Sequence, residues 1–342
     1  MKQITIIFAS LACLLLMTQV GFAQQTQGVE AAVNKAFPKE ATVPMVRFVP
    51  PNTEETLNKI GKFFFGGPLT AEMAEEDTGR YLYFTDEYSR LWYYPMSGAF
   101  EWVRIEPPIK AEFDTSDENI DKFQDLALVV IKAIRGDISH PMESIEFERN
   151  SRVHAFTGTY ASEGNDIEHF VRRVDVRFRQ TIAGMPVFQG SWAVVSFCGD
   201  TEICGVKVLL RDIAEVAEHE ILPIEKVTSG LLTFASELDG RYYVSHVDQS
   251  IEPIVGYITR AESYLQMAAA PMLIIPVCQS LLTATGTGCE MKSSIAQPLV
   301  DDYESWKALL LPKPCMKKGK FRKSSNLLIA RIHLKRLSVR PS

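Results

Sequence analysis

The chain has 342 residues, which is long for one ordinary hydrophobic core and sufficient for two or three small domains. Hydrophobic residues make up 46% and charged residues 23% of the sequence, as in soluble globular proteins. Ten Lys and Arg residues and no acid lie between Lys313 and Ser342, and removing these charges and Lys2 from the net charge of −6 leaves −17 for the rest. Such an acidic body repels nucleic acid and anionic lipid, so neither is an expected partner.

The first 23 residues have the pattern of a secretory signal peptide. Lys2 precedes an apolar run from Ile4 to Met17, and Gly21 and Ala23 are the small residues of a cleavage site before Gln24. The run is too short to cross a bilayer comfortably, although retention as an anchor is the alternative. No later stretch reaches 18 apolar residues. We therefore expect a secreted or periplasmic (cell-envelope) protein with no membrane span after cleavage.

A first structured unit is predicted for residues 43–109, after a mixed segment (24–42) for which no element is expected. A helix follows Asn52 and Thr53, either of which can cap it, and Gly66 and Gly67 end it. Three strands are then predicted between Gly79 and Ile105. They are rich in aromatic residues. Four of these are candidate ligand-facing residues for sugars or extended peptides: Tyr83, Trp92, Tyr94 and Trp102. Because strands alternate, about half of the rings in this region are needed as core.

A second unit is predicted for residues 114–212. Its helix begins at a capping box of Thr115 and Glu118, and one apolar stripe runs along it: Ile120, Phe123, Ala127, Val130, Ile131 and Ile134. Antiparallel strands follow. In one of them, alternation places an amide on the apolar face: Val174, Val176, Phe178, Gln180 and Ile182. An unpaired buried amide costs about 1–3 kcal/mol, so Gln180 is expected to have fixed hydrogen-bond partners.

A third unit, residues 222–310, repeats the plan of a helix followed by strands. The helix "LPIEKVTSGLLTFASEL" is expected to turn Ile224, Val227, Leu231 and Phe234 inward. The basic tail, residues 313–342, differs abruptly in character and is predicted to be disordered or a frameshifted end. The predicted fold class is therefore α+β, with two or three similar small modules in which a helix packs across a curled antiparallel sheet.

Catalytic motifs are missing at recognisable spacings. The six histidines include no pair at metal-binding i,i+4 spacing, and no nucleophile elbow, Cys-His signature or phosphate-binding fingerprint occurs. A site assembled from distant residues remains an alternative. We predict no catalytic residues, no metal and no cofactor, and hence a protein that is not an enzyme.

Five cysteines remain after the signal peptide, and export makes disulfides feasible. Cys198 and Cys204 flank "GDTEI", and Cys278 and Cys289 flank "QSLLTATGTG". Both pairs are candidate loop-closing disulfides, and neither has CxxC metal or redox spacing. Free buried thiols are the alternative for each pair.

The stretch "VRFRQTIAGMPVFQGSW" carries a family resemblance. Five of its residues fall in the order of a motif at a hairpin turn: Gln180, Gly184, Pro186, Val187 and Gly190. This order resembles the propeptide module of the fungalysin–thermolysin class, and the later phrase "PMLIIPV" is similar to the end of a PepSY module. The resemblance covers about Asp114 to Cys278. It implies a cystatin-like arrangement of a helix across a curled sheet, in which Gln180 fixes the register of the hairpin.

Members of these families usually inhibit or chaperone a peptidase that follows them in the same chain. Only about 60 residues follow Cys278 in this sequence, and they include no protease. The sequence therefore predicts an exported, non-enzymatic module that binds, inhibits or chaperones a separate envelope or secreted protein, such as a peptidase. The alternative is a small-molecule or glycan-binding protein that uses the Tyr/Trp-rich strands.

Overall fold

A computed structural model of the chain describes residues 27–105, 114, 116–136, 140–158, 167–188, 190–236, 242–259, 266–281 and 290–301. The predicted signal peptide (1–23) and the basic tail (313–342) lie outside these residues. Within the described ranges, no helix is both long and apolar enough to cross a membrane.

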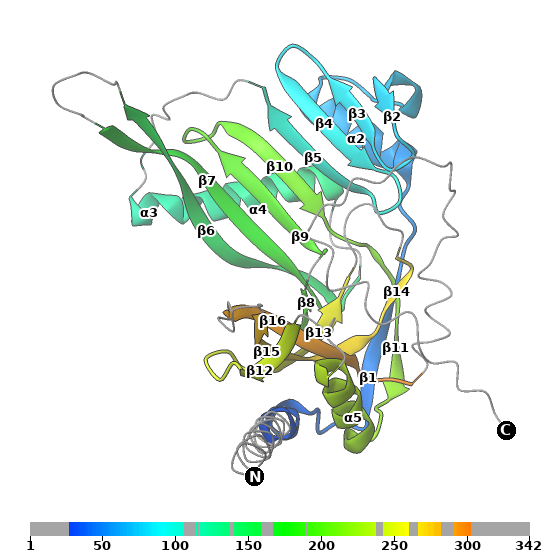
Figure 1. Cartoon of the computed structure of the whole chain (residues 1–342). Coiled ribbons are helices and arrows are strands. Elements are labelled where there is room, and N and C mark those ends of the chain that lie inside the picture. Colours follow the sequence, from blue (N-terminus) through cyan, green and yellow to red (C-terminus); the bar gives the residue numbers. More distant parts are fainter. Residues whose placement is uncertain are drawn as a thin grey trace, which may run out of the picture.

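Strands dominate the fold (Figure 1). In chain order they are β1 (Thr42–Phe48), β2 (Glu76–Asp77), β3 (Leu82–Thr85), β4 (Ser89–Tyr94), β5 (Ala99–Arg104), β6 (Glu143–Gly158), β7 (Ile167–Ile182), β8 (Met185–Phe188), β9 (Trp192–Phe197), β10 (Ile203–Leu209), β11 (Ile213–Glu220), β12 (Tyr242–Val247), β13 (Ile254–Ile258), β14 (Ala268–Ala269), β15 (Pro271–Leu281) and β16 (Glu290–Pro298). The helices are α2 (Thr53–Phe64), α3 (Asp117–Ile120), α4 (Lys122–Arg135) and α5 (Ile224–Ser236), with a 3-10 turn at Ala71–Met73. Residues 27–36 are also helical.

One continuous sheet connects most of the strands, in the order β12-β15-β13-β8-β7-β9-β10-β5-β4-β3-β2. β16 adds to β15, and β6 adds to β7. The pairings along this path are antiparallel except for a short parallel contact between β8 and β13, where Val187 lies opposite Tyr257. A separate three-stranded sheet has the order β11-β1-β14.

The predicted fold class is therefore wrong. The expectation was two or three small cystatin-like or PepSY-like modules with a helix across each sheet. The structure is instead mostly β, with large multi-stranded sheets. The physical reason lies in long-range pairing: β1 pairs with β11, about 170 residues later in the chain, and none of the local helix-then-strand patterns indicates that contact.

The main hydrophobic core lies between the helices α2 and α4 and one face of the sheet from β3 to β7. In Figure 1, α4 runs behind the strands β6, β7, β9 and β10. The core draws on residues from both of the first two predicted units. Its fully buried members include Leu57 of α2, Leu91 of β4, Ala127 of α4 and Val195 of β9. The meander and the sheet that follows it thus share a single core.

Local sequence accounts for much of the helices of this core, although the second helix begins after Ser116, whose side chain makes no cap hydrogen bond, and not at the predicted capping box. The side chain of Asn52 caps α2 by accepting a hydrogen bond from the backbone N–H of Glu55. Gly61 is required within α2, because a Cβ there would lie 2.5 Å from the carbonyl oxygen of Gly67. The predicted apolar stripe of the second helix is confirmed, since all six of its residues are buried. That helix is interrupted at Asp121, between α3 and α4.

Two further clusters occupy the other end of the molecule. One joins the helical residues 27–36, β1, α5, β12, β15 and β16. The other joins β1, the end of β7, β8, β11, β13 and β14. In this last cluster, the hydroxyl of Tyr257 donates a hydrogen bond of 2.7 Å to the carbonyl oxygen of Pro44. Burial, and to a lesser degree Glu218, raises the pKa of Tyr257, which keeps this hydroxyl protonated.

Candidate functional site

The hairpin between β7 and β8 contains the residues of the predicted motif. Its two-residue loop is Ala183-Gly184, and both residues have positive φ (51° and 74°). A loop of this kind matches the right-handed twist of the flanking strands, and glycine adopts it without a steric penalty. Pro186 lies opposite Thr181, and Val187 is buried. Gly190, also at positive φ (76°), separates β8 from β9.

Gln180 is fully buried, as its position on the apolar face predicts, and its amide makes several hydrogen bonds. Its Nε2 donates to Oε1 of Glu143 (2.7 Å) and to the carbonyl oxygen of Arg211 (2.6 Å). Its Oε1 accepts from the hydroxyl of Ser191 and from the backbone N–H of Arg211. The amide therefore connects β7 to the first residue of β6, to Ser191 just before β9 and to Arg211 between β10 and β11.

The partners of Gln180 extend this contact into a buried polar cluster, which we define as Arg135, Glu143, Gln180, Ser191 and Arg211. Nη2 of Arg135 lies 2.6 Å from Oε1 of Glu143 and 2.7 Å from Oδ1 of Asp212. The side chain of Glu143 is fully buried, so its charge depends on this arginine. Sequence analysis missed Arg135 and Glu143, because each stands at the end of an element and outside any recognisable motif.

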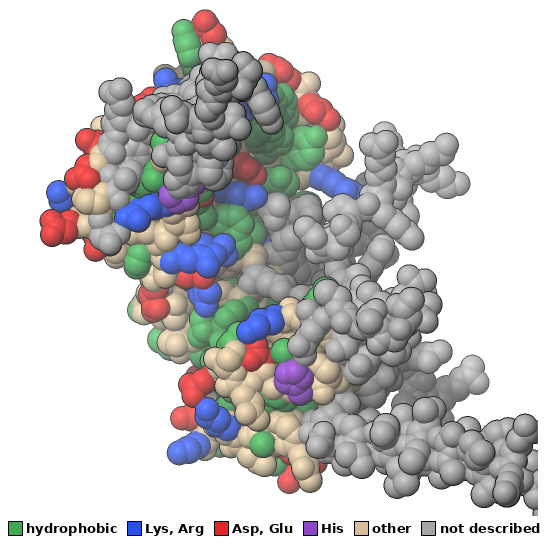
Figure 2. All heavy atoms as spheres, turned by 60° about the vertical axis from the view of Figure 1, so that its left-hand side comes forward, with side chains coloured by type: hydrophobic (Ala, Val, Ile, Leu, Met, Phe, Trp, Pro, Cys, Tyr) green, Lys and Arg blue, Asp and Glu red, His purple; other side chains and the backbone are tan. Residues whose placement is uncertain are grey.

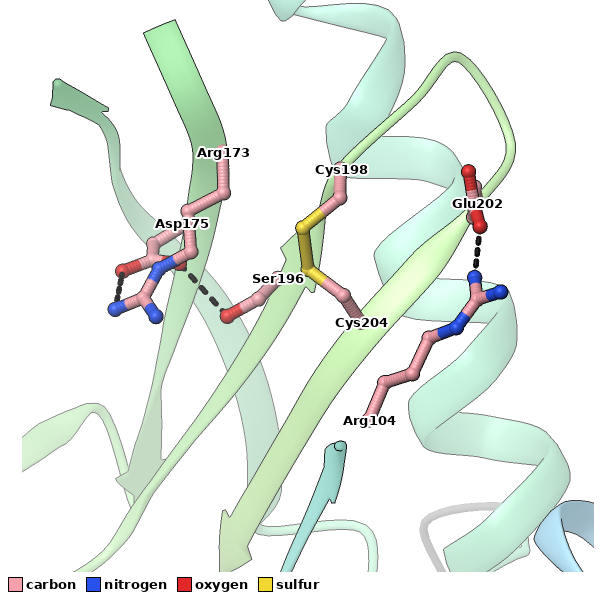
Figure 3. The surroundings of a disulfide bond; sticks show 7 residues. All are labelled: Arg104, Arg173, Asp175, Ser196, Cys198, Glu202 and Cys204. Carbon is pink, nitrogen blue, oxygen red and sulfur yellow. Dashed lines mark hydrogen bonds and ion pairs between the residues drawn. A yellow bond between two sulfur atoms is a disulfide. The ribbon is translucent and has the colours of Figure 1, made fainter. Parts of the chain in front are cut away.

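The predicted disulfide between Cys198 and Cys204 is confirmed; it closes the turn between β9 and β10 (Figure 3). Both cysteines are buried. On one side of the disulfide, Arg104 of β5 pairs with Glu202 in the turn. On the other, the hydroxyl of Ser196 donates to Asp175 of β7 (2.7 Å). These contacts fix the turn to both neighbouring strands. Of the second predicted pair, Cys278 is buried in β15 and Cys289 lies outside the described residues.

The four candidate aromatic residues do not share one face. Trp102 points into the main core, where it stacks on Phe64 with ring centroids 4.3 Å apart. Tyr83, Trp92 and Tyr94 lie on the opposite face of the sheet and are partly exposed. The rings of Tyr83 and Trp92 are 5.3 Å apart. Three of the four candidates are thus available to a ligand.

A fourth partly exposed ring on this face, that of Trp192 in β9, was missed by the sequence analysis. The guanidinium carbon of Arg177 and Nζ of Lys207 lie 5.2 Å and 5.3 Å from its centre. Both cations also have acidic partners, since Arg177 pairs with Glu148 and Lys207 with Glu101. The strict alternation of β9 was the signal that could have placed Trp192 on the outer face.

The strand β6 forms an edge of the sheet. Fifteen of its 16 residues pair with β7, and the described strands include no partner on its other side. Gln180, which lies opposite Ile145, directs its own backbone N–H toward Ser191 on the β9 side. In an antiparallel ladder, the backbone of Ile145 must then face away from β7. Asn150 lies opposite Val176, four residues from Gln180 on β7, because the bulge between Phe147 and Arg149 inserts one extra residue into β6. Its backbone N–H therefore points the same way as that of Ile145, toward the free edge.

Two shallow hollows lie along the seam between α3–α4 and β6. The first, of about 500 Å³, is lined by Leu128, Lys132, His140, Pro141, Glu143, Ser144 and Ile145. The second, of about 530 Å³, is lined by Ile120, Asp121, Phe147, Arg149, Asn150 and Arg152. Figure 2, which brings the β6 side forward, shows Lys and Arg side chains gathered beside hydrophobic ones near the middle of this view. A free strand edge and two hollows thus occur together.

Comparisons with known proteins add little to this geometry. No family model matches the chain, and no curated protein matches it in sequence. Among solved structures, the chain is similar to an uncharacterized protein from Eubacterium rectale ATCC 33656, with 11% sequence identity and a TM-score of 0.34. That match covers 76% of this chain and 84% of the other. At this TM-score the similarity supports no conclusion on fold or function. The propeptide and PepSY resemblance stays a prediction.

Within the described ranges, no group of three or more His, Cys, Asp or Glu side chains is arranged to hold a metal ion.

Replacing Gln180 with Leu is expected to lower the free energy of unfolding by about 1–3 kcal/mol, because Ser191 and Glu143 would lose a buried partner. Urea denaturation of the purified variant measures the change. The matched control is Gln124→Leu on α4, whose side chain is half-buried and has no hydrogen bond to a described residue. Equal losses in both variants would contradict the role assigned to Gln180.

Removal of the disulfide by Cys198→Ser together with Cys204→Ser is expected to lower the free energy of unfolding by about 2 kcal/mol. The bond spans six positions, so it restricts only a short loop of the unfolded chain. Peptide mapping by mass spectrometry should first find the two cysteines linked in the unreduced protein. Recovery of both thiols in alkylated form from protein made under oxidising conditions would contradict the bond.

Proposed function

We propose that this chain is an exported, non-enzymatic binding protein that captures an extended segment of another envelope or secreted protein, such as a peptidase. The observation that carries the proposal is the free edge of β6. A strand edge offers backbone N–H and C=O groups to an incoming strand, and adjacent hollows select its side chains. Natural proteins usually shorten or cover such edges, which makes a 16-residue edge a candidate for recognition.

The rigidity of the neighbouring strands supports this use. β6 is paired along its length with β7, and β7 is fixed in turn by β9 and by the buried contacts of Gln180. A partner strand would therefore meet an edge that is already ordered. Because little chain ordering remains to be done on this side, the entropic cost of association is reduced. Inhibition or chaperoning of a peptidase would follow if the captured segment belonged to its active-site rim or to an unfolded part of it.

A second candidate function is glycan or small-molecule binding on the outer sheet face. The observation that favours it is the partly exposed ring pair of Tyr83 and Trp92. Aromatic rings of this kind stack on the apolar faces of sugars. The β6 edge, by contrast, is accompanied by two hollows. The strand edge is therefore the better supported site.

The edge proposal is tested with Asn150→Pro and Asn150→Ala. Both variants lose the side-chain hydrogen bond to the carbonyl oxygen of Ile120 (3.4 Å), but only proline removes the backbone N–H that faces the free edge. The chain from Gln24 onward is immobilised and exposed to the native envelope fraction, and the retained proteins are identified by mass spectrometry. We expect a set of proteins that wild type and Asn150→Ala retain and that Asn150→Pro loses.

Circular dichroism and thermal unfolding of both variants provide the folding control. If Asn150→Pro is folded and retains the same proteins as wild type, β6 is not the binding edge. Turnover of any substrate that a single His or Asp substitution abolishes would overturn the non-enzymatic part of the proposal.

The glycan alternative predicts that Trp92→Ala weakens binding of a neutral or acidic oligosaccharide at least ten-fold in calorimetric titration, because a stacking surface is lost. Trp92→Phe, which keeps a ring, should retain most of the affinity. Wild-type protein that binds no member of an oligosaccharide panel would remove this candidate.

A further inference from the structure

We infer that the outward face of α4 is a self-association surface, on which two copies of the chain pair their α4 helices in antiparallel orientation. This inference goes beyond the proposed function and concerns a different surface. It is carried by an apolar stripe that the fold leaves exposed and by two opposite charges on one flank of that stripe.

The exposed stripe consists of Leu126, Val129 and Ala133. The inner face of α4 already supplies five buried residues to the main core, so this helix is apolar on two faces. Val129 is 64% exposed and Leu126 38% exposed, and Ala133 is exposed as well. Scattered apolar residues on a surface need no explanation, but residues three and four positions apart adjoin one another along a helix. A helix face that only meets water normally carries polar residues instead.

The stripe has the spacing of a two-stranded helical pairing. Leu126 and Ala133 take the a positions of a heptad, and Val129 takes the d position between them. Lys122 takes the preceding d position, where its aliphatic stem can cover Ala133 of a second copy. When two such helices run antiparallel, Leu126 of each copy packs against Val129 of the other. Two-fold symmetry repeats this contact, so both central layers are apolar.

The charges beside the stripe indicate that its occupant is a second copy. Asp125 and Lys132 take the two g positions, on the same flank of the stripe. Both are exposed, and neither side chain forms an ion pair or a hydrogen bond with a described residue. In an antiparallel pair with two-fold symmetry, Asp125 of each copy lies beside Lys132 of the other. Two charges that have no partner in the single chain thus complement each other across the pair.

The arrangement of the helices leaves this face open to a second copy. α2 and α4 cover the same side of the sheet (Figure 1), and Phe63 of α2 is 42% exposed. An interface of standard size buries about 800 Å² on each partner, so we expect α2 to contribute beside the stripe. Leu128, on the opposite flank of α4, lines the first hollow next to β6. Pairing through α4 and strand capture by β6 therefore use different flanks of the helix.

Other occupants match these charges less well. The basic tail, residues 313–342, carries ten Lys and Arg and no acid, so it offers no partner to Lys132. A purely apolar segment of a different protein would cover the stripe and leave Asp125 and Lys132 without partners. A second copy satisfies both charges with one contact made twice.

Sedimentation equilibrium of the chain from Gln24 onward tests the inference. We expect a reversible monomer–dimer equilibrium that Val129→Glu weakens about ten-fold or more, because each dimer would bury two unpaired carboxylates. Glutamate is a good helix former, so the variant should stay folded. The matched control is Gln124→Glu, which adds the same charge to α4 at a half-buried position outside the stripe and should leave the equilibrium unchanged.

The flanking charges test the orientation of the pair. Asp125→Lys alone and Lys132→Glu alone each place like charges side by side twice in a dimer, and each should weaken association about three-fold or more. Combining the two substitutions restores opposite charges across the pair, so association should return close to that of wild type. Circular dichroism and thermal unfolding of the variants provide the folding control.

Four results would overturn the inference. A chain that stays monomeric at the highest attainable concentration has no such surface. A dimer that Val129→Glu leaves intact and Asn150→Pro abolishes is formed by the β6 edge. A double charge variant that associates as weakly as the single variants would refute the antiparallel pairing. An envelope protein that a monomeric wild-type chain retains, and that Val129→Glu loses, would assign the stripe to a different partner.

Discussion

The hydrogen bonds of one buried amide, that of Gln180, connect strands that are far apart in the sequence. Its side chain contacts the first residue of β6, the residue before β9 and Arg211, which lies between β10 and β11. Without these bonds, three strand ends would carry unsatisfied polar groups in an apolar interior. These bonds connect the start of the edge strand β6 to β7 and to the residue before β9. Because the oxygen and the nitrogen of this amide are both hydrogen-bonded, slippage by a single residue is disfavoured.

Glu143 transmits that order to the candidate site. It is the first residue of β6, and its carboxylate is held by Gln180 on one side and by Arg135, the last residue of α4, on the other. The helix and the edge strand that form the two walls of the seam therefore meet at one ion pair. Because this pair is buried, loss of either partner would leave an uncompensated charge. The seam is thus held at a defined width at the end where α4 and β6 converge.

Local pattern predicted much of this structure, and non-local pairing was the part that it missed. The stripe of α4, the alternation of β7, the Asn52 cap and the Cys198–Cys204 bond were all visible as short-range signals. Gln180 was identified because a polar residue on an apolar face needs partners, but those partners come from 37 and 31 residues away and carry no motif. The strands β1, β11 and β16 were missed, and the predicted modules failed with them. The free edge of β6 could not be predicted either, because the position of a strand at a sheet edge depends on the other strands and not on its own sequence.

The pairing of β1 has a consequence for how the chain reaches its native state. This strand lies near the predicted mature N-terminus, yet its partners are β11 and β14, and the apolar side chains beside it belong to α5, β15 and β16. The first strand to be synthesised therefore has its strand partners only after a large part of the chain has followed. Contacts so distant in sequence form late, because loop closure must precede them. A chain with this topology leaves the edges of β1 open to wrong partners until β11 and β14 have been made.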